Sequence, residues 1–349
     1  MSKKKKTVIA IIIVVLAVGA AGIFVLDKMA EALFCNNSHS KNVMRFYEEP
    51  EDSLDGVYIG SSAAYRYWNA PMAYEDYGMT VYGLSTYIQP ITLPEYFLKE
   101  AEKSQDNLKF AIVELRNLAR PSVAYNDKNF KLVSDAMPYS KNRYDAIEAY
   151  HEYCSEISAD IDYTTLDYHF PILRRNGKWI FDYEWGDYRN YKNTESRSYK
   201  GFYPAEYSAQ PLEDTGEITA REPLEKADRK LLKSLADTAE KMYFDVIFVS
   251  SPAMQNEFRT GILNSACDYM EERGFNVLNF NVEPLRSDID MDWSSDFYDE
   301  QHVVAQGSTR YTKYLSRYLA EHYELEDHRN QEGFESWDEA VKKMKEAIR

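Results

Sequence analysis

The stretch VYIGSSAAYRYWNAPMAYEDYGMTVYGLST, residues 57–86, contains two short apolar segments with a helical segment between them. Residues 56–59 and 79–84 are typical of buried strands, and residues 70–77 are typical of a helix. Strands that alternate with helices predict a parallel sheet. The small residues Gly60, Ser61 and Ser62 follow the first strand directly. Many hydrolases present a serine on such a turn, and many turns of this kind are only structural, so the rest of the chain has to decide.

The same alternation continues on both sides of a less regular centre. Nearly continuous apolar runs predict three further strands, at residues 109–115, 244–252 and 276–280. Helical spacing of apolar residues and end signals predict helices at residues 94–105, 223–242, 254–273, 307–321 and 337–348. Gly274 suits the end of the third of these helices. The predicted fold is therefore α/β, a flavodoxin-like three-layer α/β/α sandwich with a five-stranded, mostly parallel sheet.

The centre of the chain, from about residue 120 to 222, is predicted to be an insert in this domain. Apart from a helical stretch near residues 143–158, it is polar and rich in tyrosine, and residues 181–204 are expected to form a long loop. Its aromatic side chains suit either packing against the domain or a glycan-binding surface that Tyr65 and Trp68 would extend. These aromatic residues are Trp179, Tyr183, Trp185, Tyr188 and Tyr191.

The N-terminus has the pattern of a membrane anchor. Residues 3–6 are four lysines, and the 20 residues that follow, TVIAIIIVVLAVGAAGIFVL, carry no charge. A helix of this length spans a hydrocarbon core of roughly 30 Å, and the lysines mark the cytoplasmic side. A cleaved signal peptide is the alternative, since residues 18–21 are small. The chain is thus divided into a basic tip (1–6), a transmembrane helix (7–26), a stalk (27–54), the α/β domain (55–325) and a helical tail (326–349).

Composition excludes several classes of partner and cofactor. The net charge is −16, which disfavours binding to the phosphate backbone of nucleic acids. Three cysteines allow one disulfide bond but no disulfide framework. None of the six histidines forms a closely spaced pair, so neither a metal nor another cofactor is expected.

Polar residues gather at the predicted carboxyl ends of the strands, where open α/β sheets bind their ligands. Ser61 and Ser62 follow the first strand, Gly83 ends the second, and Glu114, Arg116 and Asn117 follow the third. Asp299 and His302 precede the last helix of the domain. A histidine can activate a serine hydroxyl, and a carboxylate can orient that histidine. Backbone amides at Ser62 and Gly83 are candidates to hold the oxyanion.

This order of motifs resembles the SGNH (GDSL-type) hydrolase superfamily over residues 55–118 and 223–320. The similarity is greatest to its membrane-anchored bacterial branch of D-alanyl transfer proteins and exopolysaccharide O-acetyltransferases. The resemblance implies Ser62 as nucleophile, Gly83 as the glycine of the second block, and Asp299 and His302 as the last block.

The third block departs from that superfamily. Many members carry Gly-x-Asn-Asp after the third strand as an oxyanion donor, whereas this chain reads VELRNLARP at residues 113–121. Asn117 and Arg116 are the candidates to replace the missing donor, and Gln89 is a weaker one. An ordinary strand-end cap or ion pair is the alternative role for Asn117 and Arg116.

The resemblance implies a membrane-anchored, extracytoplasmic serine acyltransferase or esterase that acts on a cell-envelope polysaccharide or a teichoic-acid-like polymer. Its acyl donor would come from a membrane-embedded acyltransferase. The protein would lie in the cell membrane with a single span and a cytoplasmic N-terminus. The alternative is a catalytically inactive SGNH-like module that binds glycan or assists envelope assembly.

Overall fold

The computed structural model describes residues 3–119, 127–171, 180–193 and 199–348. Its centre is a sheet of five strands, all of them parallel, in the order β2-β1-β3-β4-β5. The predicted parallel five-stranded sheet is therefore confirmed. The five strands are β1 (Gly56–Gly60), β2 (Val81–Ser85), β3 (Phe110–Glu114), β4 (Asp245–Ser250) and β5 (Asn276–Asn279).

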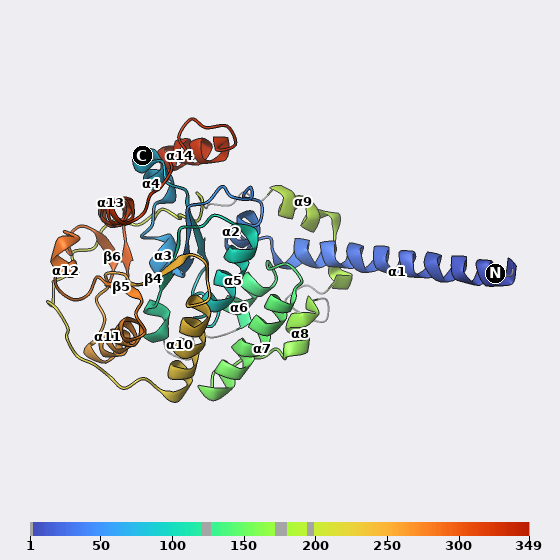
Figure 1. The fold of residues 1–349 in the computed structure, drawn as a ribbon, viewed down its shortest axis with the longest axis horizontal. Coiled ribbons are helices and arrows are strands. Elements are labelled where there is room, and N and C mark those ends of the chain that lie inside the picture. The colour runs from blue at the N-terminus through green and yellow to red at the C-terminus, as the bar shows by residue number, and fades with distance from the viewer. Residues whose placement is uncertain (1–2, 120–126, 172–179, 194–198, 349) are drawn as a thin grey trace.

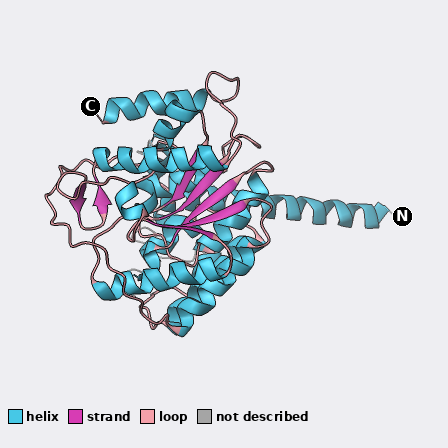
Figure 2. Ribbon diagram, turned by 60° about the vertical axis from the view of Figure 1, so that its left-hand side comes forward, coloured by secondary structure: helices cyan, strands magenta, loops and turns pink. Residues whose placement is uncertain are grey.

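Helices pack around this sheet (Figures 1 and 2). Those that follow the strands of the sheet are α3 (Ser62–Tyr65), α4 (Ala70–Tyr77), α5 (Pro94–Ser104), the 3-10 helix η1 (Arg116–Ala119), α10 (Lys226–Ala239), α11 (Glu257–Glu272), α12 (Leu285–Asp288) and α13 (Ala305–His322). Between α12 and α13 lies a small antiparallel pair, β6 (Phe297–Asp299) and β7 (His302–Val303).

The local signals in the sequence account for the bounds of these elements. Asn69 caps α4 by accepting a hydrogen bond from the Met72 amide, and Pro71 occupies its first turn. At the end of α11 the chain turns at Gly274 with φ +87°, a backbone conformation that glycine adopts without strain. Every residue of β1, β2 and β3 is buried, which explains their nearly continuous apolar composition.

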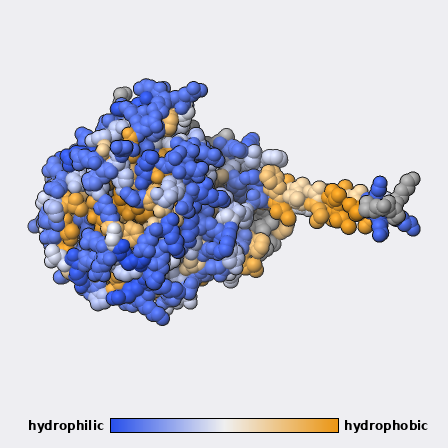
Figure 3. Space-filling view, in the orientation of Figure 1, coloured by the Kyte–Doolittle hydropathy of each residue, from blue (hydrophilic) through white to orange (hydrophobic). Residues whose placement is uncertain are grey.

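The N-terminal helix α1 (Lys3–Phe34) projects from the body of the protein (Figure 1). It is long and apolar enough to cross a membrane, and an 18-residue window within it has a mean hydropathy of 3.1. In Figure 3 its apolar surface stands out against the largely polar body.

Residues 27–54 differ from the predicted stalk. The last turns of α1 enter the body, where Ala32 and Cys35 are fully buried. After a short turn, α2 (Ser38–Phe46) packs against β2 and buries Val43 and Phe46 in the core. These residues are therefore part of the folded domain, and their polar composition reflects hydrogen bonding rather than solvent exposure. Asn42, for example, donates to the Gly83 and Ser85 carbonyls of β2.

The insert supplies the remaining helices described in the centre of the chain: α6 (Asp127–Ser134), α7 (Lys141–Glu156), α8 (Thr165–His169), the 3-10 helix η4 (Ile180–Asp182) and α9 (Trp185–Asn193). Part of the expected loop at 181–204 is thus helical. The tail helix α14 (Glu335–Ala347) packs on α4 through Trp337, whose ring lies 5.6 Å from that of Tyr74.

Candidate active site

Ser62 begins α3, two residues after Gly60, the last residue of β1. At Gly60, the last residue of that strand, a Cβ atom would lie 2.8 Å from Glu114 Cβ and 3.0 Å from Ala64 Cβ. Only glycine lets the first strand, the third strand and the short helix meet this closely. The resulting turn holds Ser62 at the carboxyl end of β1, with only 5% of the residue exposed.

His302 lies beside this serine, although 240 positions separate them in sequence. Its Nε2 atom is 2.8 Å from Ser62 Oγ, and its Nδ1 atom is 2.9 Å from both carboxylate oxygens of Asp299. Because a carboxylate only accepts hydrogen bonds, Nδ1 carries the ring proton and Nε2 is left to accept the serine proton. The structure therefore brings together the three residues predicted to be catalytic, in the geometry of a serine–histidine–aspartate triad.

The β6–β7 hairpin holds Asp299 and His302 together. Its two-residue turn places Asp299 opposite His302, and the Gln301 amide donates to Asp299 Oδ1 at 2.8 Å. Burial raises the pKa of Asp299, but the hydrogen bonds from His302 and Gln301 outweigh it and hold this pKa below its ordinary value. The carboxylate is thus ionised at neutral pH, as an orienting group for His302 must be.

Two tyrosines near the triad were not singled out by the sequence analysis. The Tyr298 ring is nearly parallel to the His302 ring, at 5.4 Å between centroids and an angle of 7°. The Tyr207 ring lies 4.8 Å from that of Tyr298, between centroids, and Tyr207 is largely exposed. Tyr298 sits in the motif FYDEQH, but sequence alone does not show which side of the hairpin it faces.

Arg116 connects to the same hairpin through Tyr67. Its Nη1 atom lies 3.2 Å from Tyr67 Oη, which in turn lies 3.0 Å from the Gln301 carbonyl oxygen. The guanidinium is buried, and its neighbour Glu114 accepts from the Arg116 and Ser251 amides. Burial raises the pKa of Glu114, and the charge of Arg116 opposes that effect. Among the described residues, the hydrogen bonds of Arg116 thus connect η1 to Tyr67, which contacts the hairpin, and to the Pro252 carbonyl, and none is made to Ser62.

Asn117, the other candidate from the third block, lies next to Ser61, the residue before Ser62. Its Oδ1 atom accepts from Ser61 Oγ at 2.9 Å, and its Nδ2 atom donates to the Gln89 carbonyl. The Thr86 amide donates to the Gly60 carbonyl at 3.3 Å. These contacts bring the turn after β2 against the serine turn.

Gly83 is not placed to hold an oxyanion, and this part of the prediction is wrong. It lies in the middle of β2, not at its end, and its amide donates to the Lys200 carbonyl at 2.9 Å. A Cβ atom at position 83 would lie 3.0 Å from Gly201 Cα. Glycine is needed here because a segment of the insert crosses the edge strand in direct backbone contact.

We expect Gly83→Ala to lower stability without impairing the chemistry of Ser62. Overpacking of this kind typically costs about 1–3 kcal/mol. Chemical unfolding of the full chain in detergent measures the loss, and the rate of fluorophosphonate labelling per folded molecule should stay within about threefold of wild type. A fall of about 10²–10³ in that rate at unchanged stability, as for loss of an oxyanion donor, would restore Gly83 to the site.

The aromatic residues proposed as a glycan surface separate into different groups. Trp68 is buried and donates to the Val81 carbonyl, and Tyr65 is buried beside Tyr203, so both serve packing. Trp179 lies outside the described residues. Trp185 and Tyr188 are exposed on α9, which packs against α1.

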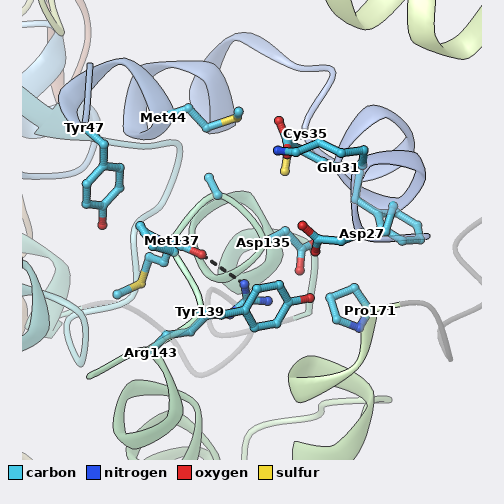
Figure 4. Close-up of a pocket in the computed structure, with 15 residues that line it drawn as sticks. Asp27, Glu31, Cys35, Met44, Tyr47, Asp135, Met137, Tyr139, Arg143 and Pro171 are labelled. Carbon is cyan, nitrogen blue, oxygen red and sulfur yellow. Dashed lines mark hydrogen bonds and ion pairs between the residues drawn. The ribbon is translucent and has the colours of Figure 1, made fainter. Parts of the chain in front are cut away.

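Two cavities are relevant to these groups. One of about 510 Å³ is lined by two residues of the triad, Asp299 and His302, though not by Ser62, and by Tyr298, Gln210 and Leu212, among others. The other, of about 330 Å³, lies at the base of α1 and includes none of the triad residues (Figure 4). The first is therefore the candidate substrate cavity.

Among the described residues, no group of three or more histidine, cysteine, aspartate or glutamate side chains is arranged to hold a metal ion. Cys35, Cys154 and Cys267 are all buried and form no disulfide bond. The site thus offers a serine nucleophile, a base and an orienting carboxylate. Comparison of the sequence with family models and with curated proteins finds no match.

Proposed function

We propose that this chain is a membrane-anchored, extracytoplasmic serine acyltransferase or esterase of the SGNH type, acting on a cell-envelope polysaccharide or teichoic-acid-like polymer. The observation that carries this proposal is the continuous chain of hydrogen bonds from Ser62 through His302 to Asp299. The strand order β2-β1-β3-β4-β5 supports the finer assignment of a flavodoxin-like three-layer sandwich. The apolar helix α1, preceded by lysines, supports a single span with the domain outside.

In the first half-reaction, Ser62 Oγ attacks the acyl carbonyl of the donor while His302 Nε2 accepts the serine proton. The tetrahedral intermediate collapses, and His302 returns this proton to the departing alcohol or thiol, which leaves an ester on Ser62. In the second half-reaction, His302 takes a proton from a sugar hydroxyl or from water, which attacks that ester. Ser62 leaves with the proton from His302, and the acyl group is on the acceptor. Asp299 stabilises the imidazolium formed in both halves.

The oxyanion needs donors close to Ser62. Among the described residues, the Ser62 amide has no protein acceptor in the hydrogen-bond network, as expected at the first turn of a helix. With Gly83 excluded, we place the second donor in the turn at residues 86–89, which contacts Gly60 and Asn117. Asn117 remains the side-chain candidate, and Arg116 is assigned to supporting the hairpin.

The cavity beside the triad suits a polymer with hydroxyl groups. Gln210 offers an amide, and Tyr298 offers an aromatic ring beside a hydroxyl, both next to His302. The backbone of Gln210 is held in place, because its backbone amide donates a hydrogen bond to the Phe297 carbonyl at 2.8 Å. Neutral hydrogen-bonding groups and an aromatic ring at an open site are compatible with a sugar acceptor that delivers its hydroxyl to His302.

An acyl-enzyme trapped by mass spectrometry tests this function. The full chain in detergent is mixed with p-nitrophenyl acetate, quenched in acid within seconds and measured intact, and the modified peptide is then identified. We expect the mass of one acetyl group on the peptide that contains Ser62. Faster loss of this adduct with an added envelope polymer indicates transfer, and loss at the rate in water alone indicates an esterase. Absence of any adduct on Ser62 would favour the inactive binding module.

A further inference from the structure

Exposed aromatic side chains gather in the segments of the insert that adjoin the base of α1. Phe181 is 79% exposed and Trp185 is 75% exposed, unusually high values for side chains of this size. We call the group the aromatic rim. Its members are Tyr139, Phe170, Phe181, Trp185 and Tyr188.

Contacts with α1 place the rim around this helix from more than one segment. The elements η4, which contains Phe181, and α9, which contains Trp185, both pack against α1. Tyr191, also on α9, donates a hydrogen bond from its hydroxyl to the Glu31 carboxylate. In Figure 1, α9 lies alongside α1 where that helix meets the body.

The other members of the rim adjoin the cavity at the base of α1. Tyr139 and Pro171, the residue after Phe170, line this cavity together with Asp27 and Glu31 of α1 (Figure 4). Tyr139 also stacks against Arg143, whose guanidinium lies 4.2 Å from the ring centre and donates to the Met137 carbonyl. The rim is thus anchored to the folded insert on this side as well.

Helix geometry gives the height of the rim relative to a bilayer. If residues 7–26 fill the hydrocarbon core, Asp27 begins the headgroup region and Glu31 lies about 7.5 Å beyond Leu26 at 1.5 Å per residue. The headgroup region on each side of the core is roughly 5–8 Å thick. Tyr139, which shares a cavity with Asp27 and Glu31, and Tyr191, which bonds to Glu31, therefore lie at headgroup depth, where tryptophan and tyrosine are enriched in membrane proteins. Phe181 and Trp185 belong to η4 and α9, which pack against the same helix.

The charges of η4 and α9 do not by themselves favour an anionic lipid surface. The charged residues in the described range 180–192 have both signs, with no basic excess: Asp182, Glu184, Asp187, Arg189 and Lys192. The whole chain carries −16, so an anionic membrane would repel the body. Aromatic burial, at about 1.5–3 kcal/mol for a large apolar side chain, is the attraction that these two elements supply.

We infer that the aromatic rim docks the catalytic domain onto the outer surface of the lipid bilayer, with phosphatidylcholine-type zwitterionic lipids sufficient for contact. This inference rests on the proposal that α1 spans the membrane. Because α1 runs without a break into the body, the rim and the span act as one rigid unit, and together they fix the orientation of the domain. An insert that the resemblance to SGNH hydrolases leaves without a role thereby acquires one.

Depth measurements on the full chain in phosphatidylcholine nanodiscs test this inference. A nitroxide is attached to a cysteine introduced by Phe181→Cys or Trp185→Cys, and its collisions with oxygen and with a water-soluble nickel chelate are compared. Phe258→Cys is the matched control, because Phe258 is an aromatic residue 60% exposed on α11, away from α1 in Figure 1. Val15→Cys reports on the span itself. The native cysteines are buried, so labelling is selective.

We expect positions 181 and 185 to collide several-fold less with nickel, and more with oxygen, than position 258. Equal collision rates at positions 181, 185 and 258, with position 15 deep in lipid, would overturn the docking role of the aromatic rim and leave the membrane anchor intact. Shielding of 181 and 185 only when an envelope polymer or a membrane protein is added would also overturn it and identify the true occupant. A water-exposed position 15 would overturn the rim and the anchor together. None of these readings depends on catalysis, and Ser62→Ala should leave them unchanged.

Discussion

Ser62→Ala is expected to abolish covalent labelling of the full chain by a fluorophosphonate probe, whereas Ser61→Ala is expected to keep it. Loss of the nucleophile in serine hydrolases lowers kcat by about 10⁶-fold, to the level left by binding and the oxyanion hole. The two serines are adjacent, both buried, and differ in their partners: Ser62 Oγ lies beside His302, and Ser61 Oγ donates to Asn117. Only Ser62 has a base beside it that can take its proton.

The pair separates chemistry from folding. Each substitution removes one buried hydroxyl with one hydrogen bond, so each should cost a similar free energy of unfolding, about 0.5–1.5 kcal/mol. Labelling is measured with esterase activity toward p-nitrophenyl acetate, and unfolding by thermal melting in the same detergent. Labelling that survives in Ser62→Ala and disappears in Ser61→Ala would move the nucleophile by one residue. Labelling unaffected by either would exclude this turn as the catalytic site.

The parts of the fold that could be predicted from sequence are those governed by local rules. The strands β1, β2 and β3 are buried at every residue and so appear as apolar runs, whereas β5 at the sheet edge buries only Leu278 and Asn279. Helix α4 has its cap and its proline where the rules for helix ends place them. The pairing of Asp299 with His302 could be anticipated because both lie on one short hairpin. That Ser62 lies next to them depends on the carboxyl ends of parallel strands meeting at one edge.

What could not be predicted depends on contacts between distant segments. Gly83 fits a second-block glycine by position, but Gly201 of the insert lies against it, and the Lys200 carbonyl accepts a hydrogen bond from its amide. No local pattern links residues 83 and 200. Similarly, α9 packs against α1, a contact that no local pattern indicates. The region 27–54 appeared to be a stalk because it is polar, although Asn42 bonds to carbonyls of β2, and Val43 and Phe46 are buried in the core.

Asp299→Asn is expected to lower kcat/KM by about 10⁴-fold and to leave the fold intact. The carboxylate of Asp299 accepts the Nδ1 proton of His302. An asparagine can turn its amide toward Nδ1, which moves the ring proton to Nε2 and removes the atom that accepts the proton of Ser62. The side chain is about half exposed, so the free energy of unfolding should change little.

Glu300→Gln is the matched control, because Glu300 follows Asp299 directly in the chain and lies in the turn of the same hairpin. The substitution neutralises one carboxylate there, as Asp299→Asn does. The Glu300 carbonyl accepts the Met254 amide through the backbone, which the substitution keeps. We expect this variant to retain activity within a few-fold, so a loss of several hundredfold or more would show that net charge, not orientation of His302, is what Asp299 supplies.

The pKa of Asp299 lies below its ordinary value of about 3.9. Protonation of this carboxylate therefore sets in only below about pH 4, and any loss of wild-type activity between pH 7 and 5 must come from another group.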